Sequence, residues 1–325
     1  MDRWLVLALL IAAMGCATTA PPPESVDVRM IPDEANAVLA ILDKRHRGEP
    51  ITEADWGQVF NSEGYVRLKA REHSMQRKFE DDTFREFVMS DALLARREEL
   101  AATLRSWLTA DIANSRDLTL RYLPERARLR AKVYPVIKPA TNSFVFDLGG
   151  DPAIFMYVEP LPREVFEATI AHELHHVGYA ANCPSTDDAA WFSAFGEGIA
   201  TLAAAGGPNG VPQKRPEVAA EWAKQMAQYD QNFHAVADFL SKVKSGELTG
   251  DAARKRGFEF FGMVGPWYTV GWKMAVVIET IEGRDALIRA SCAGRELLRA
   301  YNRAVPEWRK RTGEDLPLWP ASLVE

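Results

Sequence analysis

The stretch TIAHELHHVGYA, Thr169–Ala180, places three of the chain's six histidines within five positions. Each residue advances about 100° around an α-helix, so His172 and His176 lie one turn apart on the same face. Glu173 lies one step around the helix from them. Apolar residues recur in this segment at helical spacing: Val165, Phe166, Ile170, Leu174 and Val177. The pattern predicts a half-buried helix that directs two imidazoles toward one point.

The spacing His-Glu-x-x-His is typical of helices that bind zinc through both imidazoles and use the glutamate as a general base. A catalytic zinc site has three protein ligands and one open position. Glu197 is the candidate third ligand, because a lone carboxylate in the apolar stretch WFSAFGEGIATLAAA is costly to bury without a counter-charge. We therefore expect His172, His176 and Glu197 to hold Zn²⁺; the alternative is a solvent-facing Glu197. Gly196 and Gly198 are expected to let their helix approach the histidine helix closely.

The chain before this site is mostly helical in pattern. Residues 33–130 read as helix almost throughout, with a first helix that ends at Gly48 and a second that begins with a capping box at Thr52 and Asp55. Three short segments rich in aromatic and β-branched residues then predict the strands of a small sheet, at 131–137, 142–148 and 153–158.

The helical pattern resumes at PLP (160–162) and runs to about Tyr179. Asp187 or Asp188 is expected to cap the next helix, which ends at GGP (206–208). Further helices are predicted at 216–244, 251–261, 266–281 and 284–304. The order of helices, small sheet and helices predicts an α+β fold that is mostly helical.

The N-terminus MDRWLVLALLIAAMGC reads as a signal peptide, because its apolar run is too short to span a bilayer and follows Arg3. Gly15 and Cys16 resemble a bacterial lipoprotein cleavage site. We therefore expect a lipid on Cys16 that anchors the chain to the membrane, in the cell envelope and facing the periplasm from the outer membrane. Ala17 after the cysteine favours the outer membrane. The alternative is ordinary cleavage, for instance after Ala20.

The expected organisation has five parts. They are the signal peptide at 1–16, a Pro-rich tether at 17–32, an N-terminal helical region at 33–130, a catalytic domain at 131–305 and an irregular tail at 306–325.

Two further cysteines, Cys183 and Cys292, would lie in an oxidising compartment. We expect a disulfide between them that closes a loop of about 110 residues and adds roughly 4–5 kcal/mol of stability in the chain-entropy model. Two buried thiols are the alternative.

Composition sets broad limits on the class of protein. Hydrophobic residues make up 47% of the 325 residues, enough for a sizeable core. The net charge of −6 is spread without long runs of one sign, which argues against a nucleic-acid partner.

The histidine pair followed by Glu197 resembles the gluzincin pattern of thermolysin-like metallopeptidases. The wider sequence resembles a bacterial family of zinc-dependent peptidases over most of residues 33–300. The resemblance is carried by GQVFNSEGYVRLKAREHSMQRKFEDDTFREFVMS (57–90), AKVYPVIKPATNSFVFDLGGDPAIFMYVEP (131–160), AHELHHVGY (171–179), FGEGIATLAAAGG (195–207) and GPWYTVGWKMAVVIE (265–279).

The resemblance implies a zincin-like catalytic core with a small sheet, an active-site helix and a C-terminal helical part. In it His172, His176 and Glu197 hold Zn²⁺, water takes the fourth position and Glu173 is the general base. It also implies that strand 153–158 is an edge strand that pairs with an extended peptide or protein substrate.

Amide hydrolysis also needs a donor for the developing oxyanion. Tyr268 is the candidate, because tyrosines at comparable places serve some gluzincins; His234 and Tyr179 are the alternatives, and Tyr268 could equally be an ordinary core or cap residue. Thermolysin-like enzymes carry an aspartate four residues after the third ligand, where this chain has Thr201. The aspartates at 187–188 or a backbone carbonyl could replace it as partner of a zinc-bound imidazole.

The remaining histidines and aromatics receive structural interpretations. We expect His175 to be no ligand, either a hydrogen-bond partner within the site or half-exposed. His46 and His73 are expected at the surface. Three aromatics before Glu197 are expected in the core, with a substrate pocket as the alternative: Trp191, Phe192 and Phe195.

The sequence thus favours a lipid-anchored zinc metallohydrolase, most simply a peptidase that uses Glu173 as its base. Two other classes remain open at this point. One is a zinc-binding envelope lipoprotein without turnover that acts as a scaffold, and the other is a structural lipoprotein with no metal. The presence of Glu173 favours the enzyme, because an inactive site often loses its base first.

Overall fold

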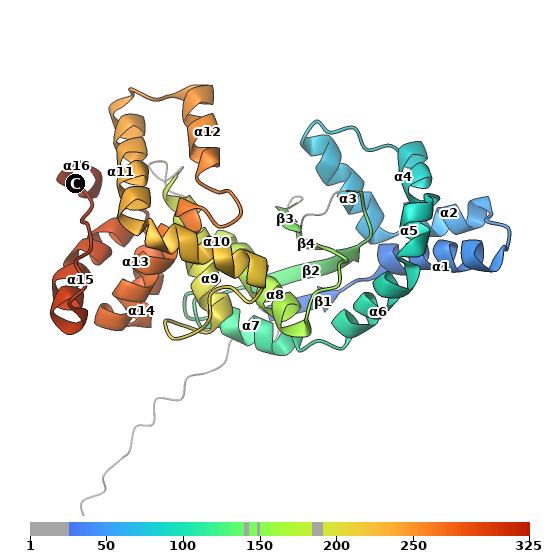
Figure 1. Cartoon of the computed structure of the whole chain (residues 1–325), viewed down its shortest axis with the longest axis horizontal. Helices are drawn as coiled ribbons and strands as arrows, with labels where there is room; N and C mark the ends of the chain where they lie inside the picture. Colours follow the sequence, from blue (N-terminus) through green and yellow to red (C-terminus); the bar gives the residue numbers. More distant parts are fainter. Residues whose placement is uncertain (1–25, 140–142, 148–149, 184–190) are drawn as a thin grey trace, which may run out of the picture.

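The computed structural model describes residues 26–139, 143–147, 150–183 and 191–325. The fold is α+β and mostly helical, which confirms the predicted class (Figure 1). The strands are β1 Val26–Met30, β2 Leu129–Val136, β3 Phe144–Asp147 and β4 Pro152–Tyr157. The helices before β2 are α1 Asp33–Arg47, α2 Glu53–Phe60, α3 Glu63–Ser74, α4 Asp81–Val88, α5 Asp91–Ala95, α6 Arg97–Leu108 and α7 Ile112–Leu120. Those after β4 are α8 Arg163–Asn182, the 3₁₀-helix η3 Phe192–Phe195, α9 Gly196–Ala205, α10 Pro216–Ala227, α11 Tyr229–Ser245, α12 Gly250–Glu259, α13 Pro266–Glu282, α14 Arg284–Ser291, α15 Glu296–Thr312 and α16 Ala321–Val324.

The four strands form one mixed sheet in the order β1-β2-β4-β3. β1, β2 and β4 are parallel and β3 is antiparallel at the edge, with Met30 beside Val133 and Val133 beside Ile154. Two expectations are therefore wrong. The predicted tether at 17–32 is wrong for residues 26–30, because the alternating VDVRM pairs with β2 as a strand. The predicted edge position of 153–158 is also wrong, because β4 is paired on both sides and β3 lies outside it.

Two apolar cores flank the histidine helix. The first joins α1, α6 and α8 to one face of the sheet, and in it the rings of Trp107 and Phe166 stack at 4.4 Å. It spans the predicted boundary near residue 130, because the N-terminal helices and the sheet bury their apolar faces against each other. The second is built by η3 and the C-terminal helices, which lie together at the other end of the molecule (Figure 1).

Several local predictions can be checked against the helices. Gly48 ends α1 in the left-handed conformation, and Thr52 and Asp55 form the capping box of α2, as expected. The predicted helices 216–244 and 284–304 are each two helices. The irregular tail is wrong for residues 306–312, because α15 continues through Pro306 to Thr312 and buries Val305 and Trp308 on its apolar face.

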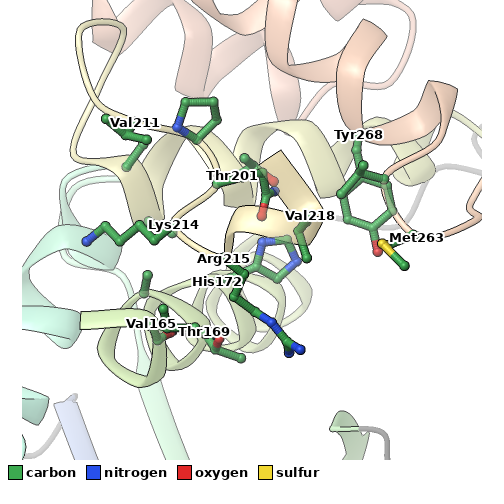
Figure 2. A pocket seen from close by; sticks show the side chains of 16 residues that line it. Val165, Thr169, His172, Thr201, Val211, Lys214, Arg215, Val218, Met263 and Tyr268 are labelled. Carbon is green, nitrogen blue, oxygen red and sulfur yellow. Dashed lines mark hydrogen bonds between the residues drawn. The ribbon is translucent and has the colours of Figure 1, made fainter. Parts of the chain in front are cut away.

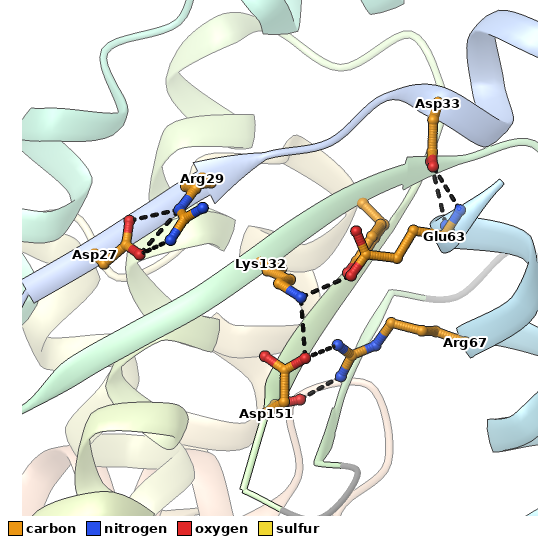
Figure 3. A network of polar contacts seen from close by, with 9 residues as sticks. Asp27, Arg29, Asp33, Glu63, Arg67, Lys132 and Asp151 are labelled. Atoms are coloured by element: carbon orange, nitrogen blue, oxygen red, sulfur yellow. Dashed lines mark hydrogen bonds and ion pairs between the residues drawn. The ribbon is translucent and has the colours of Figure 1, made fainter.

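A polar network fixes α3 on the other face of the sheet (Figure 3). Lys132 of β2 lies 2.6 Å from Glu63 and 3.0 Å from Asp151, and Arg67 also pairs with Asp151. Asp33 accepts hydrogen bonds from the backbone N–H groups that begin α3. Arg67 is the buried member of the network. Exposed ion pairs contribute little net stability, so the main effect of the network is to fix the position of α3.

A disulfide joins Cys183, at the end of α8, to Cys292, at the end of α14. It connects the histidine helix covalently to the C-terminal core. Within the described ranges, no helix combines the length and the apolar character needed to cross a bilayer. The expected signal peptide at 1–16, with Cys16, lies outside those ranges.

Glu34 is a fully buried carboxyl group in the first turn of α1. Its Oε2 accepts a hydrogen bond from the backbone N–H of Ile137 at 2.9 Å, while Oε1 has no hydrogen-bond partner among the described residues. Burial raises the pKa of Glu34 to about 8. The folded protein therefore holds this group protonated at neutral pH, where the unfolded chain ionises it.

Replacing Glu34 with Gln should make the protein more stable than wild type as the pH rises. With the folded pKa above the unfolded value of 4.5, wild-type stability falls between about pH 4.5 and 8 and then levels off. We expect the gain in unfolding free energy of Glu34→Gln over wild type to grow by on the order of 2–4 kcal/mol between pH 5 and pH 8.5, measured by urea unfolding. A difference independent of pH would contradict this assignment.

Candidate metal site

The predicted ligand atoms converge between α8 and α9. His172 Nε2 lies 3.1 Å from Glu197 Oε2 and 3.1 Å from His176 Nε2, and His176 Nε2 lies 3.2 Å from Glu197 Oε2. Atoms about 2.0–2.1 Å from a tetrahedral zinc ion are roughly 3.3 Å from one another. Two imidazole nitrogens and one carboxylate oxygen are also donors that zinc prefers. The residues therefore fit a zinc ion in both spacing and chemistry.

The charges of the three groups support a cation site. Burial lowers the pKa of His176, but the charge of Glu197 and a hydrogen bond to it outweigh burial and raise that pKa to about 9. Burial raises the pKa of Glu197, but the two imidazoles outweigh it and hold the pKa well below its usual range. Glu197 is therefore ionised, the state that a metal ligand needs. The solvent-facing alternative for Glu197 is wrong, because its side chain is only 18% exposed and points at both histidines.

Glu173 and Tyr268 lie beside the ligand atoms. The Tyr268 ring stacks on the His172 ring at 6.2 Å with an interplanar angle of 16°. Burial raises the pKa of Tyr268, as do the charge of Glu197, a hydrogen bond to it and the charge of Glu173. The charge of Glu173 also raises the pKa of His176. Glu173 and Tyr268 therefore interact electrostatically with the candidate ligands and with each other.

The two alternative oxyanion donors are engaged elsewhere. The Tyr179 hydroxyl donates a hydrogen bond to the Ser291 carbonyl at 2.8 Å. His234 is exposed on α11 and packs its ring against Phe233. Of the three candidates, Tyr268 is the one whose ring stacks on a candidate ligand.

Gly198 brings α9 against α13 and not, as expected, against α8. A Cβ atom on Gly198 would lie 2.0 Å from the Trp272 nitrogen and 2.6 Å from the Tyr268 carbonyl oxygen. Gly271 faces it from α13, where a Cβ would lie 2.7 Å from a backbone oxygen of η3. A Cβ on Gly196 would meet nothing within 4 Å. The close contact of α9 with α13 therefore sets Tyr268 beside Glu197.

His175 is buried, so its half-exposed interpretation is wrong. Burial, together with the neighbouring imidazoles of His176 and His172, lowers the pKa of His175 to about 3. Thr201, at the position where thermolysin-like enzymes have aspartate, donates its hydroxyl to the Glu197 carbonyl at 2.8 Å. The aspartates at 187–188 lie outside the described residues.

The three aromatics before Glu197 differ in how deeply they are buried. Phe195 is fully buried, while Trp191 and Phe192 are partly buried against the same core. His46 and His73 are exposed, as expected.

Two pockets adjoin the ligand atoms. The smaller pocket, of about 170 Å³, is lined by His172, Tyr268 and Thr201 among others, and Figure 2 shows these side chains around it. The larger pocket, of about 770 Å³, includes His176 and Glu197 in its wall. Three aromatic residues line the larger pocket: Trp191, Phe258 and Phe261. The sequence interpretation did not single out Phe258 or Phe261, although FEFFG (258–262) is an unusual aromatic cluster.

Replacing Gly198 with Ala should destabilise the protein by about 3 kcal/mol or more, because the new methyl group meets backbone atoms that cannot move aside. Gly196→Ala is the matched control on the same helix, expected to leave stability unchanged or to raise it by up to about 1 kcal/mol. Urea unfolding of both variants measures the difference. Equal stability of the two variants would refute the proposed role of the α9–α13 contact.

Removing the carboxylate by Glu197→Ala should weaken zinc binding more than about 100-fold, because loss of an outer partner alone costs about 10–100-fold. His234→Ala, a histidine exposed on α11, should leave zinc affinity unchanged. Competition with a chromophoric chelator measures both. Wild-type zinc affinity in Glu197→Ala would exclude it as a ligand.

Comparison with known proteins identifies the family of the chain. The family described as "Putative zinc dependent peptidase (DUF5700)" matches residues 56–308, which include the histidine helix, Glu197 and Tyr268. No curated protein matches the chain, and no solved structure matches it. Since the family match covers most of the sequence, the chain belongs to the family of this description.

Proposed function

We propose that the protein is a metallopeptidase of the gluzincin type that hydrolyses amide bonds of peptides or proteins. The observation that carries the proposal is the triangle of His172, His176 and Glu197, with Glu173 and Tyr268 beside it. Membership of the family supports the peptidase class. Ester or other hydrolysis would use the same groups, and the family favours the amide.

The three ligands would hold zinc, which supplies Lewis-acid activation of water and of the scissile carbonyl. Glu173 follows His172 directly on α8, and its charge acts on both His176 and Tyr268. From this position the carboxylate would accept the proton of the attacking water and then transfer it to the leaving amine. The Glu173 carboxylate would thus act first as a base toward water and then, once protonated, as an acid toward the leaving amine.

Tyr268 would donate its hydroxyl hydrogen to the oxygen on which negative charge develops. Burial and the nearby carboxylates raise its pKa, so the hydroxyl stays protonated at neutral pH. The contact between α9 and α13 fixes the residue before substrate arrives, and such preorganisation is what makes an oxyanion donor effective.

The sheet offers a surface for the substrate backbone. β3 is antiparallel to β4 on one side and is one of the two edge strands of the sheet, β1 being the other. An extended peptide could add to β3 through main-chain hydrogen bonds, which is the role first expected for residues 153–158.

We further propose that the protein works in the bacterial cell envelope, held by a lipid on Cys16. The apolar N-terminal segment supports this location, and so does the disulfide between Cys183 and Cys292, a bond typical of oxidising compartments. A zinc-binding lipoprotein without turnover would share both features.

Replacing Glu173 with Gln separates the peptidase from that alternative. The variant should retain zinc, because Glu173 is not a ligand, and should lose at least about 100-fold in kcat, the contribution of a general base. Glu164→Gln, in the exposed first turn of α8, is the matched control and should keep wild-type activity. The assay follows new amino termini released from a protein digest with zinc-loaded enzyme. Unchanged hydrolysis by Glu173→Gln would refute the mechanism, and absence of hydrolysis by wild type would favour the scaffold.

A further inference from the structure

We infer that the larger pocket receives a bulky apolar side chain of the substrate next to the scissile bond. Trp191, Phe258 and Phe261 are the specificity-determining residues in this assignment. The inference rests on the proposed peptidase function, and it adds the class of peptide that the enzyme selects.

The position of the pocket ties its occupant to the reaction. His176 and Glu197 form part of its wall, so a side chain bound there lies against two of the three candidate metal ligands. The smaller pocket touches His172 and Tyr268 and has about 170 Å³ of space, against about 770 Å³ in the larger one. A large side chain is therefore best accommodated on the His176 side of the site.

The chemistry of the wall favours apolar and aromatic groups. The Trp191 and Phe258 rings meet edge to face at 6.2 Å, and Phe258 and Phe261 lie 5.8 Å apart. Phe258 is 61% exposed, so a bound apolar side chain would remove aromatic surface from water. Arg254 also lines the pocket; it forms an ion pair with Asp251 in which both side chains are exposed.

Trp191, one side of the aromatic wall, is held in place before a substrate binds. Trp191 packs directly on Gly257 of α12, where a Cβ atom would lie 2.0 Å from the indole ring. Trp191 also contacts Trp267, whose ring stacks on it at 6.1 Å with an interplanar angle of 11°. The Trp267 indole N–H donates to the Gly257 carbonyl at 2.9 Å, which locks the three residues together. A rigid apolar pocket binds with little cost of ordering its own side chains.

The test measures binding without turnover. Zinc-loaded Glu173→Gln protein is titrated with labelled decapeptides of glycine, alanine and serine that carry one central residue, Phe, Gly or Arg, and binding is followed by fluorescence anisotropy. We expect the Phe peptide to bind at least about tenfold more tightly than the Gly peptide. Adding Phe258→Ala should reduce this ratio about threefold or more, and adding Phe258→Glu should make the Arg peptide the preferred one. Leu318→Ala, another exposed apolar side chain but outside the pocket, is the control and should leave the ratio unchanged.

Equal binding of the Phe and Gly peptides, or a Phe preference that survives both Phe258 variants, would overturn the inference. A proteome-derived peptide library cleaved by wild-type enzyme gives the second readout. Cleavage without enrichment of large apolar residues next to the cut overturns the inference and leaves the peptidase intact. If wild type cleaves nothing, the peptidase proposal fails, and the anisotropy ratios still decide whether the pocket selects apolar side chains.

Discussion

The structure depends on the convergence of two imidazole nitrogens and one carboxylate oxygen at separations of 3.1–3.2 Å. Three partly buried polar groups at this spacing are unfavourable unless a proton or a cation is shared among them. A proton shared between the ionised Glu197 and the neighbouring histidines meets that condition. A zinc ion would meet it for all three groups at once. The roles proposed for Glu173, Tyr268 and both pockets all depend on this group of three candidate ligands.

A pair of glycines determines which residues surround the candidate ligands. Gly198 and Gly271 allow α9 and α13 to meet with their backbones almost in contact, and this contact carries Tyr268 to the side of Glu197. α13 also supplies Trp267, on which Trp191 of the larger pocket stacks. Glu197 and Tyr268 therefore belong to two helices in close contact, and α8 brings the two histidines and Glu173.

The sequence predicts best those features that depend on residues close together in the chain. His172 and His176 meet because one turn of helix separates them, and the caps at Gly48 and Thr52 follow from neighbouring residues. Glu197 could be anticipated because a lone carboxylate in an apolar helix requires a partner. The sequence could not show which helix Gly198 contacts, because glycine permits close approach without specifying a partner. The same limit applies to the order of β3 and β4 and to the joining of β1, since strand pairing is decided by segments far apart in the chain. Phe258 was missed because exposure becomes visible only in three dimensions.

The two apolar cores place the ligands in separately packed parts of the protein. The histidines lie on α8, which packs with the sheet, and the carboxylate lies on α9, which packs with the C-terminal helices. Two imidazoles alone would form an incomplete and weak coordination set, so tight zinc binding would require the second core to be in place. Zinc capture by all three groups would therefore follow the completion of the tertiary structure, and a half-assembled chain would lack the third ligand.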